Sequence, residues 1–551
     1  MIKYGKTIKR FLIISLSLLL VCSCTACSDT KTASDAVVKK LPSKVDLRNY
    51  NGKNYITPVK RQSFGDCWSF SLAGSAEIAY LYANNMGVKA GKLNRKVDFS
   101  EKYTAWYMYH GITKDDVVIG KVKASQIGEG LDPKEGEENN PNRVYDIGGE
   151  FIHYANLYGS GFGPVDESVA VNGKYPYAYK PTSDDSWALP LNSEYRNAPQ
   201  KAFLRNSLVL PSPAKFDSKG KYRFDEDALK AIKSELYKGH GVSLAVSVSH
   251  PGFIQENMAA YCDRDYVAEH AVTVVGYDDN YPKEKFVQRD ENGKIVKGSL
   301  PPENGALIIK NSWGIIESED DGICYTSYYD HSIFSPMSYE FDNNNKVKHK
   351  KLNYDQYDLM MTEWYGNSDY KDETKMANVF TAEDNEKFFQ ISYITSLSGT
   401  DVSYEIYKNV ENNNPSSGEL LEKGDNVHNF AGYHKIDLNG EYPLKKGERY
   451  SVVLTMKRNK DNKNMVYTEV FPYSTEFSGG LKVRGIINKG ESYLYKDGKW
   501  KDMSEMKKSL IERAYKQLND KLGSKETFTP IKLDSKDTFT VDNYPIKAIS
   551  A

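Results

Sequence analysis

Residues 62–70 read QSFGDCWSF, and this stretch decides the fold. Asp66 is a residue type that caps helices, and a stripe of apolar residues follows it as far as Asn84, so the sequence predicts a helix with Cys67 in its first turn. The partial positive charge of a helix N-terminus stabilises a thiolate. Cys67 is therefore the candidate nucleophile, and a buried structural cysteine is the alternative.

Two later segments supply the groups that a thiol nucleophile requires. His270 leads into an apolar run in EHAV (269–272), and Asn311 follows another apolar run in KNSWG (310–314). Thiol acyl transfer needs a base for the thiol and a group that orients the base. We assign these roles to His270 and Asn311; His153 and His250 are the other candidate bases, but neither lies in a comparable context.

Gln62 is the candidate oxyanion donor. Its side-chain amide and the backbone N–H of Cys67 would together stabilise the negative charge of a tetrahedral intermediate. A solvated loop glutamine is the alternative interpretation.

Composition narrows the range of partners. The 551 residues carry a formal net charge of −1 and contain no long basic run, which argues against nucleic acid as a partner. We expect no cofactor and no metal site. If Cys67 is a free thiol, the body of the chain can form one disulfide, between Cys262 and Cys324.

The N-terminus has the pattern of an export signal. Basic residues precede an apolar run over 11–21, which is too short to span a bilayer permanently. Small residues and Cys22, Cys24 and Cys27 follow, a pattern that resembles a bacterial lipoprotein signal. We expect a signal peptide over 1–27, lipidation of Cys24 (or Cys27), a flexible tether over 28–40, and anchoring by lipid to the outer face of the bacterial cell membrane. Plain secretion without a lipid is the alternative.

The rest of the chain divides into two predicted domains, 41–345 and 346–551. Helical patterns over 100–110, 151–158 and 225–237 precede strand patterns over 242–248, 271–277 and 306–310, which predicts an α+β domain with a cleft between its halves. A polar and basic stretch near 343–351 is the expected linker. Short strand patterns then follow, over 388–395, 402–408, 433–438 and 450–456, and predict an all-β sandwich, interrupted by one amphipathic helix over 505–522.

Residues 41 to about 340 resemble a papain-like cysteine peptidase. Leu41 begins a run, LPSKVDLR, that is similar to the mature N-terminus of that family, and Gln62, Cys67, His270 and Asn311 fall on its oxyanion, nucleophile, base and orienting positions. The resemblance implies a helical left lobe, a β-barrel-like right lobe and hydrolysis of a protein or peptide substrate. It further implies that Gly148 and Gly149 bind the substrate backbone, and that Trp313 shields the bond between Asn311 and His270.

The region from about residue 352 is similar to the lectin-like domain of some clostridial cell-surface cysteine peptidases. The runs GESYLYKDGKW (490–500) and YPIKAI (544–549) carry this resemblance, which makes a cell-wall glycan a further candidate partner. Three departures from the peptidase pattern stand out: the loop from Gln62 to Cys67 is one residue shorter, Phe64 replaces a common disulfide cysteine, and Asp66 replaces a small residue.

A surface-anchored cysteine endopeptidase is the leading functional hypothesis. The alternative is an adhesion or carbohydrate-binding protein in which the peptidase domain is an inactive scaffold. A transpeptidase or amidase with the same thioester chemistry is a third possibility, which no feature of the sequence favours.

Overall fold

The computed structural model describes most of the chain. We refer to the described residues up to 342 as the N-terminal domain and to those from 351 onward as the C-terminal domain. The described residues are 35–114, 124–133, 136, 144–149, 151–170, 196, 198–250, 258–264, 266–288, 292–296, 299–314, 322–342, 351–352, 374–459, 463–465, 470–472, 481–512 and 539–551. The expected signal peptide with Cys24 and Cys27, the side chain of His153 and most of the expected linker lie outside this part of the chain.

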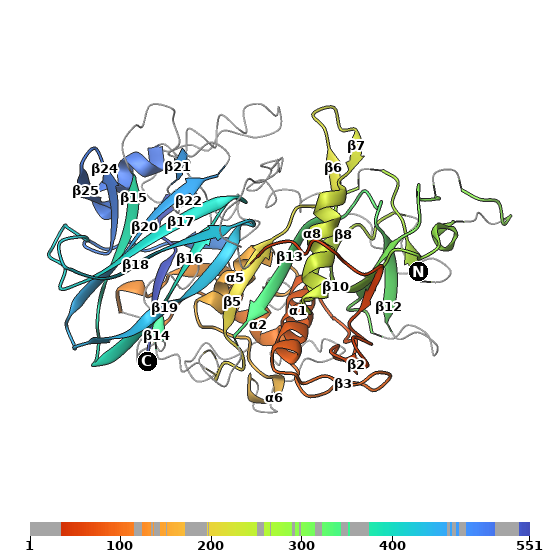
Figure 1. The fold of residues 1–551 in the computed structure, drawn as a ribbon, viewed down its shortest axis with the longest axis horizontal. Coiled ribbons are helices and arrows are strands. Elements are labelled where there is room, and N and C mark those ends of the chain that lie inside the picture. Colours follow the sequence, from red (N-terminus) through yellow and green to blue (C-terminus); the bar gives the residue numbers. More distant parts are fainter. Residues whose placement is uncertain are drawn as a thin grey trace.

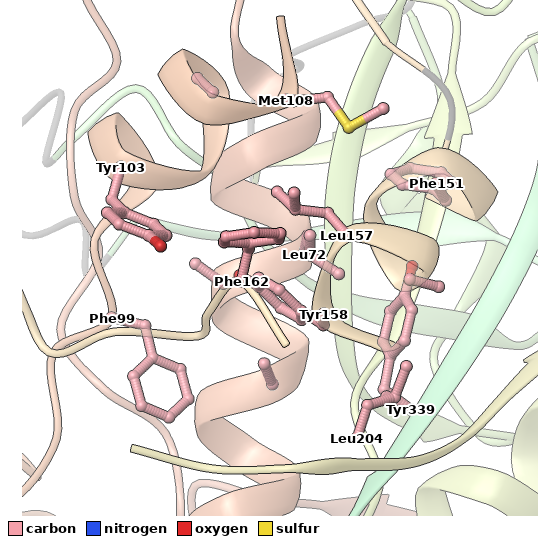
Figure 2. Close-up of a cluster of buried hydrophobic side chains, with 14 of the residues drawn as sticks. Leu72, Phe99, Tyr103, Met108, Phe151, Leu157, Tyr158, Phe162, Leu204 and Tyr339 are labelled. Carbon is pink, nitrogen blue, oxygen red and sulfur yellow. The ribbon is translucent and has the colours of Figure 1, made fainter. Parts of the chain in front are cut away.

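The first half of the N-terminal domain is a helical lobe built around α1 (Cys67–Ala83). Residues 68–81 of α1 are buried, as expected for a helix that is surrounded on all sides. In Figure 2, Leu72 of α1 and Tyr158 of α5 lie between Tyr103 of α2 on one side and Leu204 and Tyr339 of the neighbouring sheet on the other. All five side chains belong to one buried cluster. The other elements of this lobe are β2 (Lys53–Asn54), β3 (Val88–Lys89), α2 (Glu101–Met108), η3 (Ala124–Gln126), β4 (Gly130–Pro133), α5 (Phe151–Gly159) and α6 (Glu167–Ala170).

The helix starts differ in how they are capped. Ser100 and Asp225 accept hydrogen bonds from Tyr103 N–H and Ala228 N–H at the starts of α2 and α8. Asp66 occupies the N-cap position of α1, but its side chain makes no capping hydrogen bond and is fully buried. The sequence therefore predicted the position of Asp66 correctly and its capping role incorrectly.

The second half of the N-terminal domain is a sheet lobe covered by α8 (Glu226–Tyr237). Its strands run in the order β5-β13-β8-β10-β11-β12-β9, antiparallel except for β12 and β9, with β1 paired to β10. Gly74 allows α1 to pack closely on β10, because a Cβ there would lie 2.8 Å from Thr273 Oγ1. The elements are β1 (Lys44–Asp46), β5 (Leu204–Val209), β6 (Ala214–Phe216), β7 (Tyr222–Phe224), β8 (Val242–Val246), β9 (Ala259–Ala260), β10 (His270–Asp278), η5 (Lys283–Phe286), β11 (Ala306–Lys310), β12 (Ile323–Ser327) and β13 (Phe334–Phe341).

The resemblance implied a barrel-like right lobe, and the described strands of this lobe form an open sheet and not a closed barrel. Its edge strand β5 pairs with β19 of the C-terminal domain, so the described strands continue as one 12-stranded sheet, β14-β27-β16-β19-β5 and onward (Figure 1). A strand edge that is paired with another domain is no longer available to close a barrel.

The C-terminal domain is the predicted all-β sandwich. A second sheet, β18-β17-β20-β15-β24-β25 with β21, packs on β16, β19 and β27, and side chains of both sheets form one core. Residues 507–512 are helical after η6, within the helix expected over 505–522. The elements are β14 (Lys351–Leu352), β15 (Lys375–Thr381), β16 (Glu386–Thr395), β17 (Thr400–Lys408), β18 (Glu419–His428), β19 (Gly432–Leu444), β20 (Arg449–Arg458), β21 (Lys463–Met465), β22 (Val470–Pro472), β23 (Leu481–Arg484), β24 (Ser492–Lys496), β25 (Lys499–Asp502), η6 (Met503–Met506), β26 (Phe539–Val541) and β27 (Ile546–Ser550).

Cys262 and Cys324 are both buried thiols, and the disulfide that the sequence allowed is not formed between them. None of the described helices combines the length and the apolar character needed to cross a bilayer. Within the same residues, no three His, Cys, Asp or Glu side chains are grouped as metal ligands would be.

Candidate active site

The structure brings His270 and Asn311 together. His270 opens β10 and Asn311 directly follows β11, and the two strands are antiparallel neighbours. The His270 Nε2 and Asn311 Oδ1 atoms lie 2.9 Å apart, and both residues are buried. The backbone N–H of Ser312 also donates to Asn311 Oδ1, at 2.7 Å. The amide oxygen is thus held in place, and it fixes the plane of the imidazole.

Trp313 packs against the other side of this pair. Its ring centroid lies 4.7 Å from that of His270, with the two planes 30° apart. The sequence resemblance implied that this indole shields the bond between Asn311 and His270 from water, and the ring contact with His270 is compatible with that role.

Cys67 reaches the same place from the helical lobe. It is the first residue of α1, and the backbone N–H of Ala271 donates to its Sγ at 3.4 Å. The thiol therefore lies beside the backbone of the residue that follows His270, where the two lobes meet. Cys67 comes from a helix, His270 from a strand and Asn311 from the loop that follows another strand.

Burial favours the uncharged forms of both reactive groups. It raises the pKa of the Cys67 thiol to about 11, against the lowering effect of the Ala271 N–H, and the nearby Asp66 carboxylate adds to the rise. Burial also lowers the pKa of His270 to about 4, against the opposing effects of Asn311 and Glu269. At neutral pH, the resting site therefore contains a thiol and a neutral imidazole.

Gln62 is fixed by hydrogen bonds at both ends of its amide. Its Oε1 accepts from Ser312 Oγ at 2.6 Å, and its Nε2 donates to the carbonyl of Phe64 at 2.6 Å. Its backbone N–H donates to Ser312 O at 2.8 Å. An amide nitrogen carries two hydrogens, so one N–H remains for an oxyanion after the bond to Phe64.

The segment that carries Gly148 and Gly149 lies against the loop that precedes Cys67. The backbone N–H of Gly65 donates to Asp146 Oδ1 at 2.6 Å, and the rings of Phe64 and Tyr145 stack with centroids 5.4 Å apart. Gly148 has a φ of +81°, which favours glycine. Where many relatives carry a disulfide cysteine, this chain thus joins the two segments through a ring stack and a hydrogen bond.

A buried charge network behind the nucleophile was missed in the sequence. Lys60 Nζ lies 3.1 Å from Glu77 of α1 and 2.7 Å from Glu101 of α2. Lys310, the neighbour of Asn311, donates to Thr57 Oγ1 at 2.7 Å and lies 3.8 Å from Glu77. Burial raises the pKa of Glu101 to about 8 against the lowering effect of Lys60. The only signal in the sequence was Glu77 itself, a charged residue within an apolar stripe.

His250, the rival base, is buried with its ring centroid 6.0 Å from that of Tyr266, and burial lowers its pKa. Asn311 bonds to His270, which leaves His270 as the imidazole in the arrangement that the sequence predicted.

Comparisons with known proteins agree with this architecture. A family model described as "Lectin like domain" matches residues 354–515. Among solved structures, a cysteine-to-alanine variant of the clostridial cysteine protease Cwp84 after propeptide cleavage is 19% identical and superposes with a TM-score of 0.60, over 92% of this chain and 98% of that one.

A second structure holds the cysteine protease and lectin-like domains of Cwp84, a surface layer associated protein of Clostridium difficile. It is 18% identical, with a TM-score of 0.60 over 94% of this chain and 90% of that one. A comparison with curated proteins gave no match. The chain therefore has the fold of a papain-like cysteine peptidase followed by a lectin-like domain.

Proposed function

We propose that this protein is a cysteine endopeptidase that hydrolyses peptide bonds through an acyl-enzyme on Cys67. The observation that carries the proposal is the joint placement of three groups. The imidazole of His270 is held at 2.9 Å by Asn311, and the Cys67 thiol lies at the backbone N–H of the next residue. A nucleophile, a base and an orienting amide at the meeting of two lobes are the parts that thiol acyl transfer requires.

The reaction begins from a neutral Cys67 thiol and a neutral His270 imidazole. As Sγ of Cys67 attacks the peptide carbonyl carbon, the imidazole of His270 accepts the thiol proton, and Asn311 stabilises the imidazolium that forms. The developing oxyanion receives the backbone N–H of Cys67 and the remaining Nε2–H of Gln62. Proton transfer coupled to attack avoids a free thiolate, which burial and the charge of Asp66 disfavour.

The second half of the cycle uses the same groups. The imidazolium of His270 protonates the departing amine when the carbon–nitrogen bond breaks, which leaves a thioester on Cys67. The neutral imidazole then takes a proton from water, and the resulting attack on the thioester releases the acid and returns the thiol. The substrate backbone is expected to bind along Gly148 and Gly149, because neither residue has a side chain that would stand in its way; a Cβ at Gly148 would point into open space.

We further propose that the protein acts at the outer face of the bacterial cell membrane, anchored through lipid on Cys24 or Cys27. The lipoprotein-like pattern of residues 1–27 supports this location. The description of Cwp84 as a surface layer associated protein agrees with it. Proteins of the envelope are then the expected substrates, and the lectin-like domain makes a wall glycan a candidate partner.

The test is intact-mass analysis of residues 28–551 after treatment with a peptidyl-epoxide inhibitor of cysteine peptidases. Wild type, Cys67→Ala and His270→Ala are compared, with circular dichroism as the check on folding. We expect one adduct on wild type and none on either variant. Equal labelling of wild type and Cys67→Ala would refute Cys67 as the nucleophile.

One observation supports the alternative hypothesis that the peptidase domain is an inactive scaffold. The raised pKa of Cys67 and the buried Asp66 beside it both oppose an activated thiolate. Folded wild-type protein that forms no adduct and cleaves no peptide would support an inactive peptidase scaffold, and would direct attention to the lectin-like domain.

A further inference from the structure

The N-terminal domain does not complete its own cores. Ile394 and Tyr433 of the lectin-like domain belong to the core of the helical lobe, and Phe430 belongs to the core of the sheet lobe. Their exposed fractions are 0%, 2% and 5%. Removal of these side chains would open the peptidase cores to water. The three residues therefore act as core residues of the N-terminal domain, whereas residues at a contact between separate domains only cover its surface.

The backbones of the two domains are also joined at two places. His434 of β19 pairs with Asn206 of β5, and Val209 N–H donates to the carbonyl of Ala431 at 2.8 Å. Separately, β23 pairs with β4 of the helical lobe over four residues, 481–484 with 130–133. We call the contact between β5 and β19 the seam.

The seam is tight enough to require glycine. Gly432 has a φ of +140°, and a Cβ there would lie 1.7 Å from the carbonyl oxygen of Ser207. Tyr433, the next residue, donates its N–H to Ser207 Oγ at 3.1 Å. Such an approach between two backbones leaves no space for water or for sliding of one domain over the other.

Buried charges cross the seam as well. Lys435 of β19 pairs with Asp342, which follows β13, and both residues are buried. Arg205 of β5 lies 3.0 Å from Asp342 and 2.7 Å from Asp437 of β19. If the domains separated, the buried pair of Lys435 and Asp342 would break, and breaking a buried ion pair is costly.

Tyr433 links the seam to the proposed substrate cleft. Its ring lies directly on the last residue of α5, because a Cβ on Gly159 would be 2.7 Å from Tyr433 Cε2. α5 begins at Phe151, just after Gly148 and Gly149, and the hydroxyl of Tyr109 donates to the carbonyl of Gly148. One end of α5 thus follows the glycine pair, and the other end rests on the lectin-like domain.

We propose that the lectin-like domain is an integral part of the peptidase, and that Tyr433 is a positioning residue that sets the cleft wall of Gly148 and Gly149 through α5. The kinetic part of this inference rests on the proposed peptidase function; the folding part does not. The lectin-like domain then has a mechanical role in substrate binding, independent of any ligand of its own.

The kinetic test compares Tyr433→Ala with Tyr450→Ala in the full chain. Tyr450 is a matched control, because it is equally buried but lies in the core of the sandwich away from the seam. We expect Tyr433→Ala to raise KM roughly tenfold with kcat little changed, since a displaced wall weakens binding of substrate and transition state alike. Tyr450→Ala should lower the unfolding temperature without changing KM.

Tyr433→Phe keeps the ring on Gly159 and should restore the wild-type KM; Tyr433→Leu replaces the alanine variant if the latter does not fold. Equal KM values for the Tyr433 and Tyr450 variants would overturn the positioning role. Wild-type protein without turnover or adduct would instead contradict the proposed function, and the folding test below would then decide whether the domains form one unit.

The folding test is hydrogen exchange of the full chain, read by mass spectrometry. In a single cooperative unit, the slowest amides of every part exchange through global unfolding. Tyr450→Ala destabilises the lectin-like domain, and we expect it to accelerate the slowest exchange in β8 and β10 by the same factor as in β17 and β20. Acceleration confined to residues 374–551 would show two independent domains and would overturn the inference.

Discussion

Lys60 and Glu77 form an ion pair, with Nζ and Oε1 3.1 Å apart, that joins the segment before Gln62 to the middle of α1. The Glu77 carboxylate is fully buried. Without this charge, Lys60 keeps Glu101 and Asp98, but the buried Lys310 loses the carboxylate that lies 3.8 Å away, and a buried ammonium without its partner costs several kcal/mol. Glu77→Gln should therefore lower the free energy of unfolding by about 3–5 kcal/mol, measured by urea denaturation. Glu441→Gln is the control, because Glu441 pairs with Lys387 at the surface, where both side chains are 65% exposed. Similar losses in the two variants would contradict a structural role for the buried carboxylate.

The indole of Trp313 should set the position of the acid limb in the pH profile of the proposed peptidase. Burial lowers the pKa of His270 to about 4, and a base must be unprotonated to act. Trp313→Ala admits water, so the pKa of His270 should rise toward its ordinary value of 6.5 and the acid limb of kcat/KM should move to higher pH. Profiles between about pH 3.5 and 8 provide the measurement. Trp500→Ala, in the lectin-like domain, should leave the limb where it is, and a limb that does not move in Trp313→Ala would refute the shielding.

The charge of Asp66 is one reason why the thiol stays protonated. Asp66→Asn removes the negative charge next to Sγ, so the pKa of Cys67 should fall below its value of about 11 while burial keeps it above that of a free thiol. The rate of alkylation by iodoacetamide as a function of pH gives this pKa. Asp146→Asn is the matched control: its carboxylate binds Gly65 in the same loop but is not among the groups that raise the pKa of Cys67. An alkylation midpoint that stays unchanged in Asp66→Asn would disprove the electrostatic effect.

Gln62 and Ser312 should differ in their effects on turnover. Loss of one oxyanion donor costs about 10²- to 10³-fold in kcat, so Gln62→Ala should be impaired by this amount while it remains folded. Ser312→Ala removes only the hydroxyl that holds Gln62 Oε1, so the donor stays present but less ordered, and kcat should fall far less. Steady-state kinetics with one peptide substrate separate the two variants. An unchanged kcat in Gln62→Ala would exclude Gln62 from the oxyanion site.

Local patterns predicted most of the elements. The helix expected from Cys67 to Asn84 is α1, which ends at Ala83. It could be predicted because the apolar stripe that marks it lies within one short stretch of sequence. The strand expected over 433–438 is longer, and extends to Leu444 as β19. In its second half, exposed residues alternate with half-buried ones. Few of these residues are apolar, so the sequence pattern was too weak to indicate a strand there.

Residue type and order were enough to propose Cys67, His270 and Asn311 as one candidate site, because thiol chemistry needs those side chains whatever fold supports them. Long-range pairing was beyond the sequence. The ladder between β19 and β5 has one registered residue pair, His434 and Asn206, and no local pattern in the sequence indicates it. The orientation of Asp66 was also unpredictable, since a helix start makes capping the default for an aspartate.

The raised pKa of the Cys67 thiol has a consequence for the lifetime of the protein. Oxidants react with the thiolate, and a thiol with a pKa of about 11 presents almost none at neutral pH. Cys67 should therefore resist conversion to sulfenic acid in an oxidising medium while no substrate is bound, although it remains able to give up its proton to His270 during attack. The raised pKa that lowers the reactivity of the resting thiol should thus also protect it from oxidation.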